Sequence, residues 1–153
     1  MDLNAVLTTA EAVAREAGAL LMDGFGRDKE IHTKSSAVDF VTQFDVAAEQ
    51  LITARLRAAF PDHALVGEEG TNVGDAAGPT WHIDPLDGTS NFSHGFPVFC
   101  VSLALYDGAR PLVGVIYDPT RDECFSAAAG QGARLTDPRG TRPLRVSAAA
   151  ELV

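Results

Sequence analysis

The fold is decided by one stretch of the chain, Trp81-His82-Ile83-Asp84-Pro85-Leu86-Asp87-Gly88-Thr89-Ser90-Asn91-Phe92. Bulky and β-branched side chains at positions 81–83 predict a short strand. Pro85 has no N–H with which to continue a β-ladder, so we expect the strand to stop at Asp84. Gly88 then permits a sharp turn, and a polar side chain after it would cap a following helix. The candidates for that cap are Thr89, Ser90 and Asn91.

Two carboxylates are therefore expected close together, Asp84 at the strand end and Asp87 in the adjoining turn. Like charges at that distance raise each other's pKa unless a cation lies between them. Ligands that are all oxygen favour a hard ion such as Mg²⁺. Backbone N–H groups of residues 87–89, at a helix start, would bind an anion. The combination indicates a phosphate site, although Asp-x-x-Asp-Gly on its own is typical of an ordinary turn.

The rest of the chain predicts two helices followed by a series of strands. Residues 4–25 and 45–60 have apolar side chains near 3.6-residue spacing, and Pro61 ends the second helix. Residues 71–80 are rich in Gly and Pro and predict a loop. The expected β segments are 30–34, 40–42, 63–67, 96–105, 111–117, 123–128, 133–135 and 142–146. Because short turns join successive strands, we expect an α+β domain over residues 1–153, with the two N-terminal helices packed on a predominantly antiparallel sheet.

Composition narrows the class of protein. The chain has 153 residues, 46% of them hydrophobic and 22% charged, which suits one compact soluble domain. Its formal charge of −9 argues against a nucleic-acid polymer as partner. No apolar run approaches the length of a membrane span, and the N-terminal stretch carries charges that a secretory signal lacks, so we expect a cytoplasmic protein with no membrane partner. Cys100 and Cys124 are flanked by apolar residues and are expected to be buried thiols.

A second pair of carboxylates follows the expected strand 63–67, in Val66-Gly67-Glu68-Glu69-Gly70. Adjacent residues on a strand point to opposite faces. If the backbone stays extended, only one of Glu68 and Glu69 faces Asp84 and Asp87.

Two upstream stretches have both a structural and a functional interpretation. The segment Thr42-Gln43-Phe44-Asp45 has the form of a helix capping box with Asp in place of Glu, which would explain Asp45 without any chemistry. Lys34, Ser35 and Ser36 form a polar segment that would contact an anion or simply remain solvated.

In this order, the stretches 34–45, 66–70 and 84–92 resemble the inositol monophosphatase family. Its members are Mg²⁺-dependent, lithium-sensitive phosphomonoesterases related to fructose-1,6-bisphosphatase and to the bisphosphate nucleotidases. The match rests on Gly-Glu-Glu and on Asp-Pro-Leu-Asp-Gly-Thr-x-Asn-Phe, and it extends from near the N-terminus to the last residue. The resemblance implies that residues 1–153 form the first, metal- and phosphate-binding half of the layered αβ sugar-phosphatase fold.

The resemblance also implies roles for the metal ligands. One Mg²⁺ would be held by Glu68, Asp84 and the backbone carbonyl of Leu86. A second would be held by Asp84, Asp87 and an Asp from a Trp-Asp-x-Ala motif that this chain does not contain. Glu69 would support the metal site from farther away.

By the same resemblance, the attacking water would be oriented by Glu68 and Thr89, with Asp45 hydrogen-bonded to Thr89. The amides of Asp87, Gly88 and Thr89 would hold the phosphate oxygens, and Lys34 would stand farther from them. The attack would be in line, without a covalent phosphoenzyme.

The substrate and the extent of the protein stay open at this point. Inositol monophosphate is the first expectation, and a nucleotide 3′-phosphate, a sugar bisphosphate or histidinol phosphate are alternatives within the enzymes. The chain ends at Val153, about where the first half of relatives ends, so we expect a fragment of a longer enzyme that forms a homodimer when complete. The alternative is a non-catalytic metal-binding module, since a half-built second site would bind its ion weakly.

Overall fold

The computed structural model describes residues 1–26, 31–33, 40–75 and 77–148. The helices in these ranges are α1 (Leu3–Gly24), α2 (Gln43–Ala59) and α3 (Thr89–Ser93). The strands are β1 (Ile31–Thr33), β2 (Phe40–Thr42), β3 (Ala64–Gly67), β4 (Asn72–Val73), β5 (Pro79–Asp87), β6 (Cys100–Asp107), β7 (Arg110–Asp118), β8 (Glu123–Ala128), β9 (Gly132–Asp137) and β10 (Gly140–Leu144). None of these helices is both long and apolar enough to cross a membrane.

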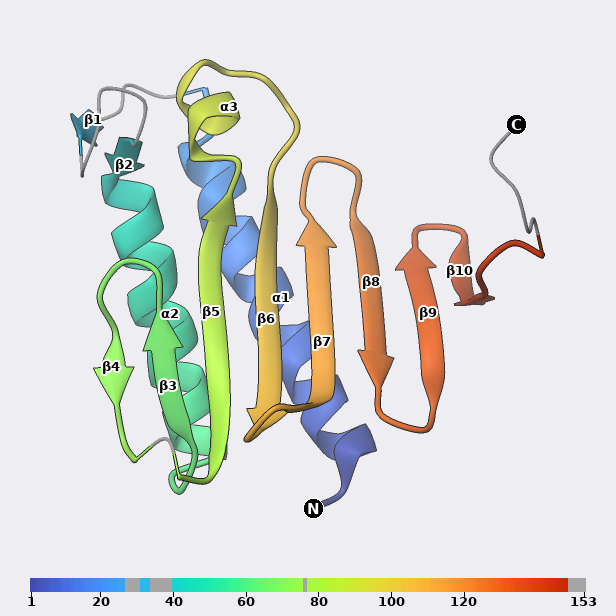
Figure 1. The fold of residues 1–153 in the computed structure, drawn as a ribbon. Helices are drawn as coiled ribbons and strands as arrows, with labels where there is room; N and C mark the ends of the chain where they lie inside the picture. Colours follow the sequence, from blue (N-terminus) through green and yellow to red (C-terminus); the bar gives the residue numbers. More distant parts are fainter. Residues whose placement is uncertain (27–30, 34–39, 76, 149–153) are drawn as a thin grey trace.

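Eight strands form one sheet in the order β10-β9-β8-β7-β6-β5-β3-β4. Neighbouring strands pair antiparallel except β3 and β5, which run parallel; between them in the chain lies β4, which pairs with the other edge of β3. Helices α1 and α2 lie side by side on one face of this sheet, and the described residues leave its other face uncovered (Figure 1). The α+β architecture predicted from the sequence is confirmed.

The core lies between the two helices and the covered face of the sheet. Along β6 only every second residue is buried, namely Val101, Leu103 and Leu105. The strand predicted over residues 96–105 therefore begins later than expected, at Cys100, and one of its faces is not enclosed. An apolar run in the sequence does not show which face of the strand a helix will cover, so the uncovered face could not be predicted.

Helix ends agree with the sequence at one position and differ at another. The capping box at the start of α2 is confirmed, with Thr42 as N-cap and Asp45 as its partner. The predicted cap of α3 is wrong, because its N-cap is Gly88, which adopts a left-handed conformation (φ 98°) and makes no side-chain cap hydrogen bond. The glycine that turns the chain thus occupies the position expected for a polar cap.

Part of the chain between β3 and β5 forms strand where the sequence predicts a loop. Residues 71–80 were expected to be a loop, but Asn72–Val73 form β4 against the edge of β3, and β5 already begins at Pro79. The turn that carries Glu68 and Glu69 is therefore flanked by two paired strands, β3 before it and β4 after it. Cys124 is buried as expected, whereas Cys100 is only half-buried.

Helix α1 packs onto β7 at a glycine. A Cβ atom on Gly18 would lie 2.5 Å from ring carbon Cε1 of Tyr117. That ring is held in place, since its hydroxyl donates to Asp122 Oδ1 at 3.0 Å and the Arg15 guanidinium lies 4.9 Å from its centroid. The absence of a side chain at Gly18 therefore allows α1 to pack closely against β7.

We expect Gly18→Ala to lower the free energy of unfolding by about 1–2 kcal/mol, because overpacking against Tyr117 outweighs the better helix propensity of alanine. Thr8→Ala on the exposed side of the same helix is the control and should be neutral or stabilising by a few tenths. Urea unfolding followed by circular dichroism measures both, and a stabilised Gly18→Ala variant would contradict this packing.

Candidate active site

A β-bulge in β5 determines where Asp84 and Asp87 lie. Asp84 pairs with Ser102 and Asp87 with Cys100, so two residues of β5 stand opposite the single residue Val101 of β6. Ser102 and Cys100 are two apart and face the same side of the sheet, and their partners must do so too.

In a regular strand, Asp84 and Asp87 would point to opposite faces, because they are three residues apart. The extra residue brings both to the uncovered face, while Leu86 turns into the core and is 1% exposed. The prediction that β5 stops at Asp84 is therefore wrong. Pro85 is tolerated inside the strand because it falls in the bulge, where the regular ladder is interrupted.

Asp84 lies against Glu68 on this uncovered face. The two residues line a groove of about 280 Å³ together with His82 and Ser102. The pKa of Asp84 is raised to about 7, first by burial, then by the charge of Glu68 and a hydrogen bond with it, and then by the charge of Asp87. The Leu86 N–H donates to Asp84 Oδ1 at 3.1 Å and partly offsets this effect. The site thus concentrates negative charge.

These residues fit part of a site for a hard divalent cation. Their donors are carboxylate oxygens, and a cation between Glu68 and Asp84 would offset the charge of Glu68, which adds to the effect of burial on the pKa of Asp84. In the ranges that the structure describes, no three His, Cys, Asp or Glu side chains gather closely enough to form a ligand set alone. Glu68 and Asp84 are therefore the centre of the candidate site, and Asp87 contributes its charge from the same face.

Thr89 is held beside this centre by two acceptors. Its Oγ1 donates at 3.1 Å to Asp45 Oδ1 and at 3.0 Å to the carbonyl oxygen of Leu86. Since both neighbours only accept, the single hydroxyl proton is committed to them, and the lone pairs of Oγ1 can accept from a third group such as water.

Asp45 connects this hydroxyl to the start of α2. It is 1% exposed, and its second oxygen accepts from both the N–H, at 2.9 Å, and the hydroxyl of Thr42. Burial raises the pKa of Asp45, while the hydrogen bonds from Thr42 and Thr89 act in the opposite direction. Asp45 therefore combines the capping role and the contact with Thr89 that the sequence presented as two interpretations.

The structure separates the remaining site residues. Glu68 and Glu69 lie in a turn after β3 rather than in extended strand, and Glu68 contacts Asp84 as expected. The Glu69 N–H points instead toward α2, where it donates to Glu49. Gly88 turns the chain between Asp87 and Thr89. Lys34, with Ser35 and Ser36, lies outside the described residues, so its predicted role stays a prediction.

Sequence reasoning missed two residues beside the site. Glu49 is a buried carboxylate on the apolar face of α2, in helical spacing with Asp45 and Ile52, and a charge on such a face was the available signal. Cys100 lies next to Asp87, with its Sγ 3.9 Å from Asp87 Oδ2. Burial and the neighbouring Asp87 and Asp84 raise the pKa of the Cys100 thiol to about 12. Only the strand pairing reveals that contact.

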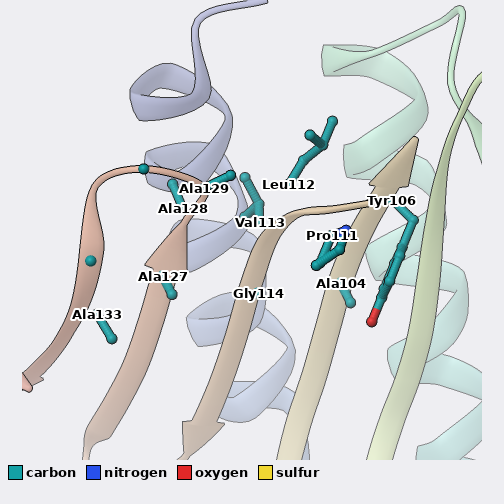
Figure 2. A pocket seen from close by; sticks show the side chains of 12 residues that line it. Ala104, Tyr106, Pro111, Leu112, Val113, Gly114, Ala127, Ala128, Ala129 and Ala133 are labelled. Atoms are coloured by element: carbon teal, nitrogen blue, oxygen red, sulfur yellow. The ribbon is translucent and has the colours of Figure 1, made fainter. Parts of the chain in front are cut away.

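A larger hollow on the sheet lies away from these carboxylates. It measures about 540 Å³ and is lined mainly by small and apolar residues of β6, β7 and β8, such as Ala104, Gly114 and Ala127 (Figure 2). Tyr106 is the one titratable residue in its lining. This hollow carries no metal ligand, so the smaller groove at Glu68 and Asp84 is the chemically equipped one.

Comparisons with known proteins agree with this geometry. The model of the inositol monophosphatase family matches residues 2–153. Inositol monophosphatase 3 of Solanum lycopersicum is 42% identical over 96% of this chain and 54% of its own length. The Nus factor SuhB of Pseudomonas aeruginosa is 45% identical over 93% of this chain and 52% of its own length.

Solved structures show the same fold. The Thermotoga maritima IMPase superposes with a TM-score of 0.87 at 35% identity, over 99% of this chain and 56% of that one. An IMPase/NADP phosphatase complexed with Mg²⁺ and phosphate has a TM-score of 0.67 at 28% identity, over 75% of this chain and 44% of that one. The chain belongs to the inositol monophosphatase family, and it spans about half the length of the curated relatives it matches.

The raised pKa of Asp84 predicts how the protein responds to pH without divalent ions. A carboxyl group with a raised pKa binds its proton more tightly in the folded state, so the contribution of Asp84 to wild-type stability falls as the pH rises from about 4 to about 7. Asp84→Asn removes this charge. At pH 8 in EDTA we expect its thermal midpoint to be about 2–4 °C above wild type, or about 1 kcal/mol.

Calorimetry at pH 5.5 and pH 8 tests this expectation. The gap between wild type and Asp84→Asn should narrow at the lower pH, where Asp84 is protonated. Glu123→Gln, on β8, is the control for loss of one carboxylate. An Asp84→Asn variant that is less stable than wild type at pH 8 would show that the carboxylate is not repelled in its site.

Proposed function

We propose that the protein of which this chain is part hydrolyses a small phosphate monoester with the aid of Mg²⁺, with inositol monophosphate as the first candidate substrate. The observation that carries the proposal is the pairing of Glu68 with Asp84 next to the Thr89–Asp45 hydrogen bond. Membership of the inositol monophosphatase family supports the reaction class. The neighbour complexed with Mg²⁺ and phosphate supports the choice of ion.

The proposed mechanism gives each residue one task. Glu68, Asp84 and the carbonyl of Leu86 would hold a metal ion, and Asp87 would contribute to a second position. Such an ion would supply charge neutralisation and would make the attacking water more acidic. Glu68 takes part in orienting that water.

Thr89 accepts a hydrogen bond from the same water, and Asp45 keeps the Thr89 proton turned away from it. This division of tasks follows from the acceptors around Thr89 Oγ1, which leave only its lone pairs for the water. The amides of Asp87, Gly88 and Thr89 bind the phosphate oxygens at the turn. Glu69 would support the metal site from farther away, and Lys34 would act farther from the phosphate.

A second candidate function is a non-catalytic module that binds a divalent ion. It is supported by the length of the chain, which is about half that of its relatives. A module that binds a divalent ion without turnover fits the observation that the described residues contain no complete set of three such side chains. Addition of EDTA and titration of Mg²⁺ in a phosphate-release assay separate the two. Turnover that depends on Mg²⁺ favours the enzyme, and ion binding without release of phosphate favours the module.

Location and assembly are proposed from the family resemblance. We place the protein in the cytoplasm, with a small phosphate ester as its ligand, and the complete protein as a homodimer. The formal charge of −9 supports the absence of a nucleic-acid partner, because a polyanion would be repelled.

Thr89→Ala tests the water-orienting role in the longest polypeptide that the gene encodes. We expect kcat to fall about 100-fold, as is usual when a group that positions a proton transfer is lost, while the Mg²⁺ affinity changes less than threefold. Thr89→Ser keeps the hydroxyl and should retain most of the activity. Phosphate release under saturating Mg²⁺ measures both variants, and unchanged kcat in Thr89→Ala would eliminate this role for the hydroxyl.

A further inference from the structure

A buried carboxylate on α2 holds the turn that carries Glu68. Glu49 is 3% exposed. Its Oε2 accepts from the N–H of Glu69 at 2.7 Å, and its Oε1 accepts from the N–H of Thr71 at 2.9 Å. Each oxygen of the carboxylate therefore binds one backbone donor of the same turn, on either side of Gly70.

Two further hydrogen bonds close the turn around Glu68. The Glu68 N–H donates to the carbonyl of Ile83 on β5 at 3.0 Å, one residue before Asp84. The Gly67 N–H donates to the carbonyl of Thr71 at 2.8 Å. Glu68 is thus tied directly to the strand that carries Asp84, and the residues that follow it are tied to Glu49.

Gly67 is required by the same carboxylate. The three nearest atoms to a Cβ built on Gly67 are Cδ, Oε1 and Oε2 of Glu49, all within 2.7 Å. Gly67 does not have a positive φ, so a glycine is needed here because it lacks a Cβ atom and not because of its backbone conformation. This contact explains why a glycine precedes the two glutamates in Gly67-Glu68-Glu69.

A buried carboxylate is costly, and backbone donors offset its desolvation only if both of its oxygens are used. A glutamine of the same shape has one acceptor oxygen, and its NH₂ group would face the N–H of Glu69 or Thr71. The turn therefore requires the two acceptor oxygens of a carboxylate at position 49, and a side chain of the same size and shape is not sufficient.

We propose that Glu49 is a positioning residue for the divalent-metal site, acting through the turn to keep the Glu68 carboxylate against Asp84. This inference rests on the proposed function, since it assumes that Glu68 and Asp84 bind the ion. Glu49 itself binds backbone N–H groups and does not contact the ion.

The test is Glu49→Gln, with Thr53→Val as a matched control. Thr53 lies one turn farther along α2, and its Oγ1 is 3.2 Å from the Oγ1 of Thr71, so Thr53→Val removes a contact with the same turn but leaves the backbone donors bound. Mn²⁺ is the probe because it prefers the same oxygen ligands as Mg²⁺. The concentration of free Mn²⁺ can also be measured by electron paramagnetic resonance. Circular dichroism selects a temperature at which all variants are folded.

We expect Glu49→Gln to weaken Mn²⁺ binding at least tenfold and Thr53→Val to change it less than twofold. Backbone amide exchange at Glu69 and Thr71 should accelerate only in Glu49→Gln. Wild-type protein that binds no Mn²⁺ would refute the proposed function and the role of Glu49 with it. Wild-type binding that Glu49→Gln leaves unchanged would refute the role of Glu49 alone.

A second pair of variants keeps the test decisive if Glu49→Gln does not fold. Gly67→Ala should weaken Mn²⁺ binding as well, because its methyl group displaces the Glu49 carboxylate. In a Glu49→Ala background the space is open, and the same change at Gly67 should alter Mn²⁺ affinity less than twofold. Equal effects of Gly67→Ala in both backgrounds would show that the glycine acts independently of Glu49 and would overturn the proposal.

Discussion

One irregularity, the bulge at Pro85 and Leu86, is the constraint on which the candidate site depends. It lets a single strand bury Ile83 and Leu86 in the core while it presents Asp84 and Asp87 on the opposite, uncovered face. Without the extra residue, one of the two aspartates would face the helices, where an ionised carboxylate is costly. The motif Asp-Pro-Leu-Asp is thus a solution to a problem of strand geometry as well as a set of candidate ligands.

Two buried carboxylates on α2 lie behind the acidic residues of the site, and hydrogen-bond donors surround them. Asp45 and Glu49 are buried on α2 and accept hydrogen bonds from Thr42, Thr89 and backbone N–H groups. Glu68 and Asp84, by contrast, lie against each other, and burial together with the charge of Glu68 raises the pKa of Asp84. The helix therefore provides carboxylates that are held by hydrogen bonds, and further negative charge is concentrated where a cation is proposed to bind. Such a division is expected of sites that trade stability for binding.

The sequence predicted the elements well because their signals are local. Apolar spacing located α1 and α2 within two residues, and Thr42 with Asp45 identified a capping box that the structure contains. The bulge escaped prediction because the rule that Pro85 ends a strand holds for regular ladders, and the interruption depends on β6. Glu49 escaped because its partners lie 20 and 22 residues farther along the chain. The contact of Glu68 with Asp84 was expected from a family resemblance, and position alone would not have shown it.

We propose that Glu68 and Asp84, brought together where β3 pairs with β5, form the core of a divalent-metal site. Anomalous diffraction from crystals soaked in Mn²⁺ tests it most directly. We expect a peak about 2.0–2.3 Å from an oxygen of Glu68, an oxygen of Asp84 and the carbonyl oxygen of Leu86. A well-diffracting crystal with no peak in this groove at millimolar Mn²⁺, or with its peaks only elsewhere on the molecule, would contradict it.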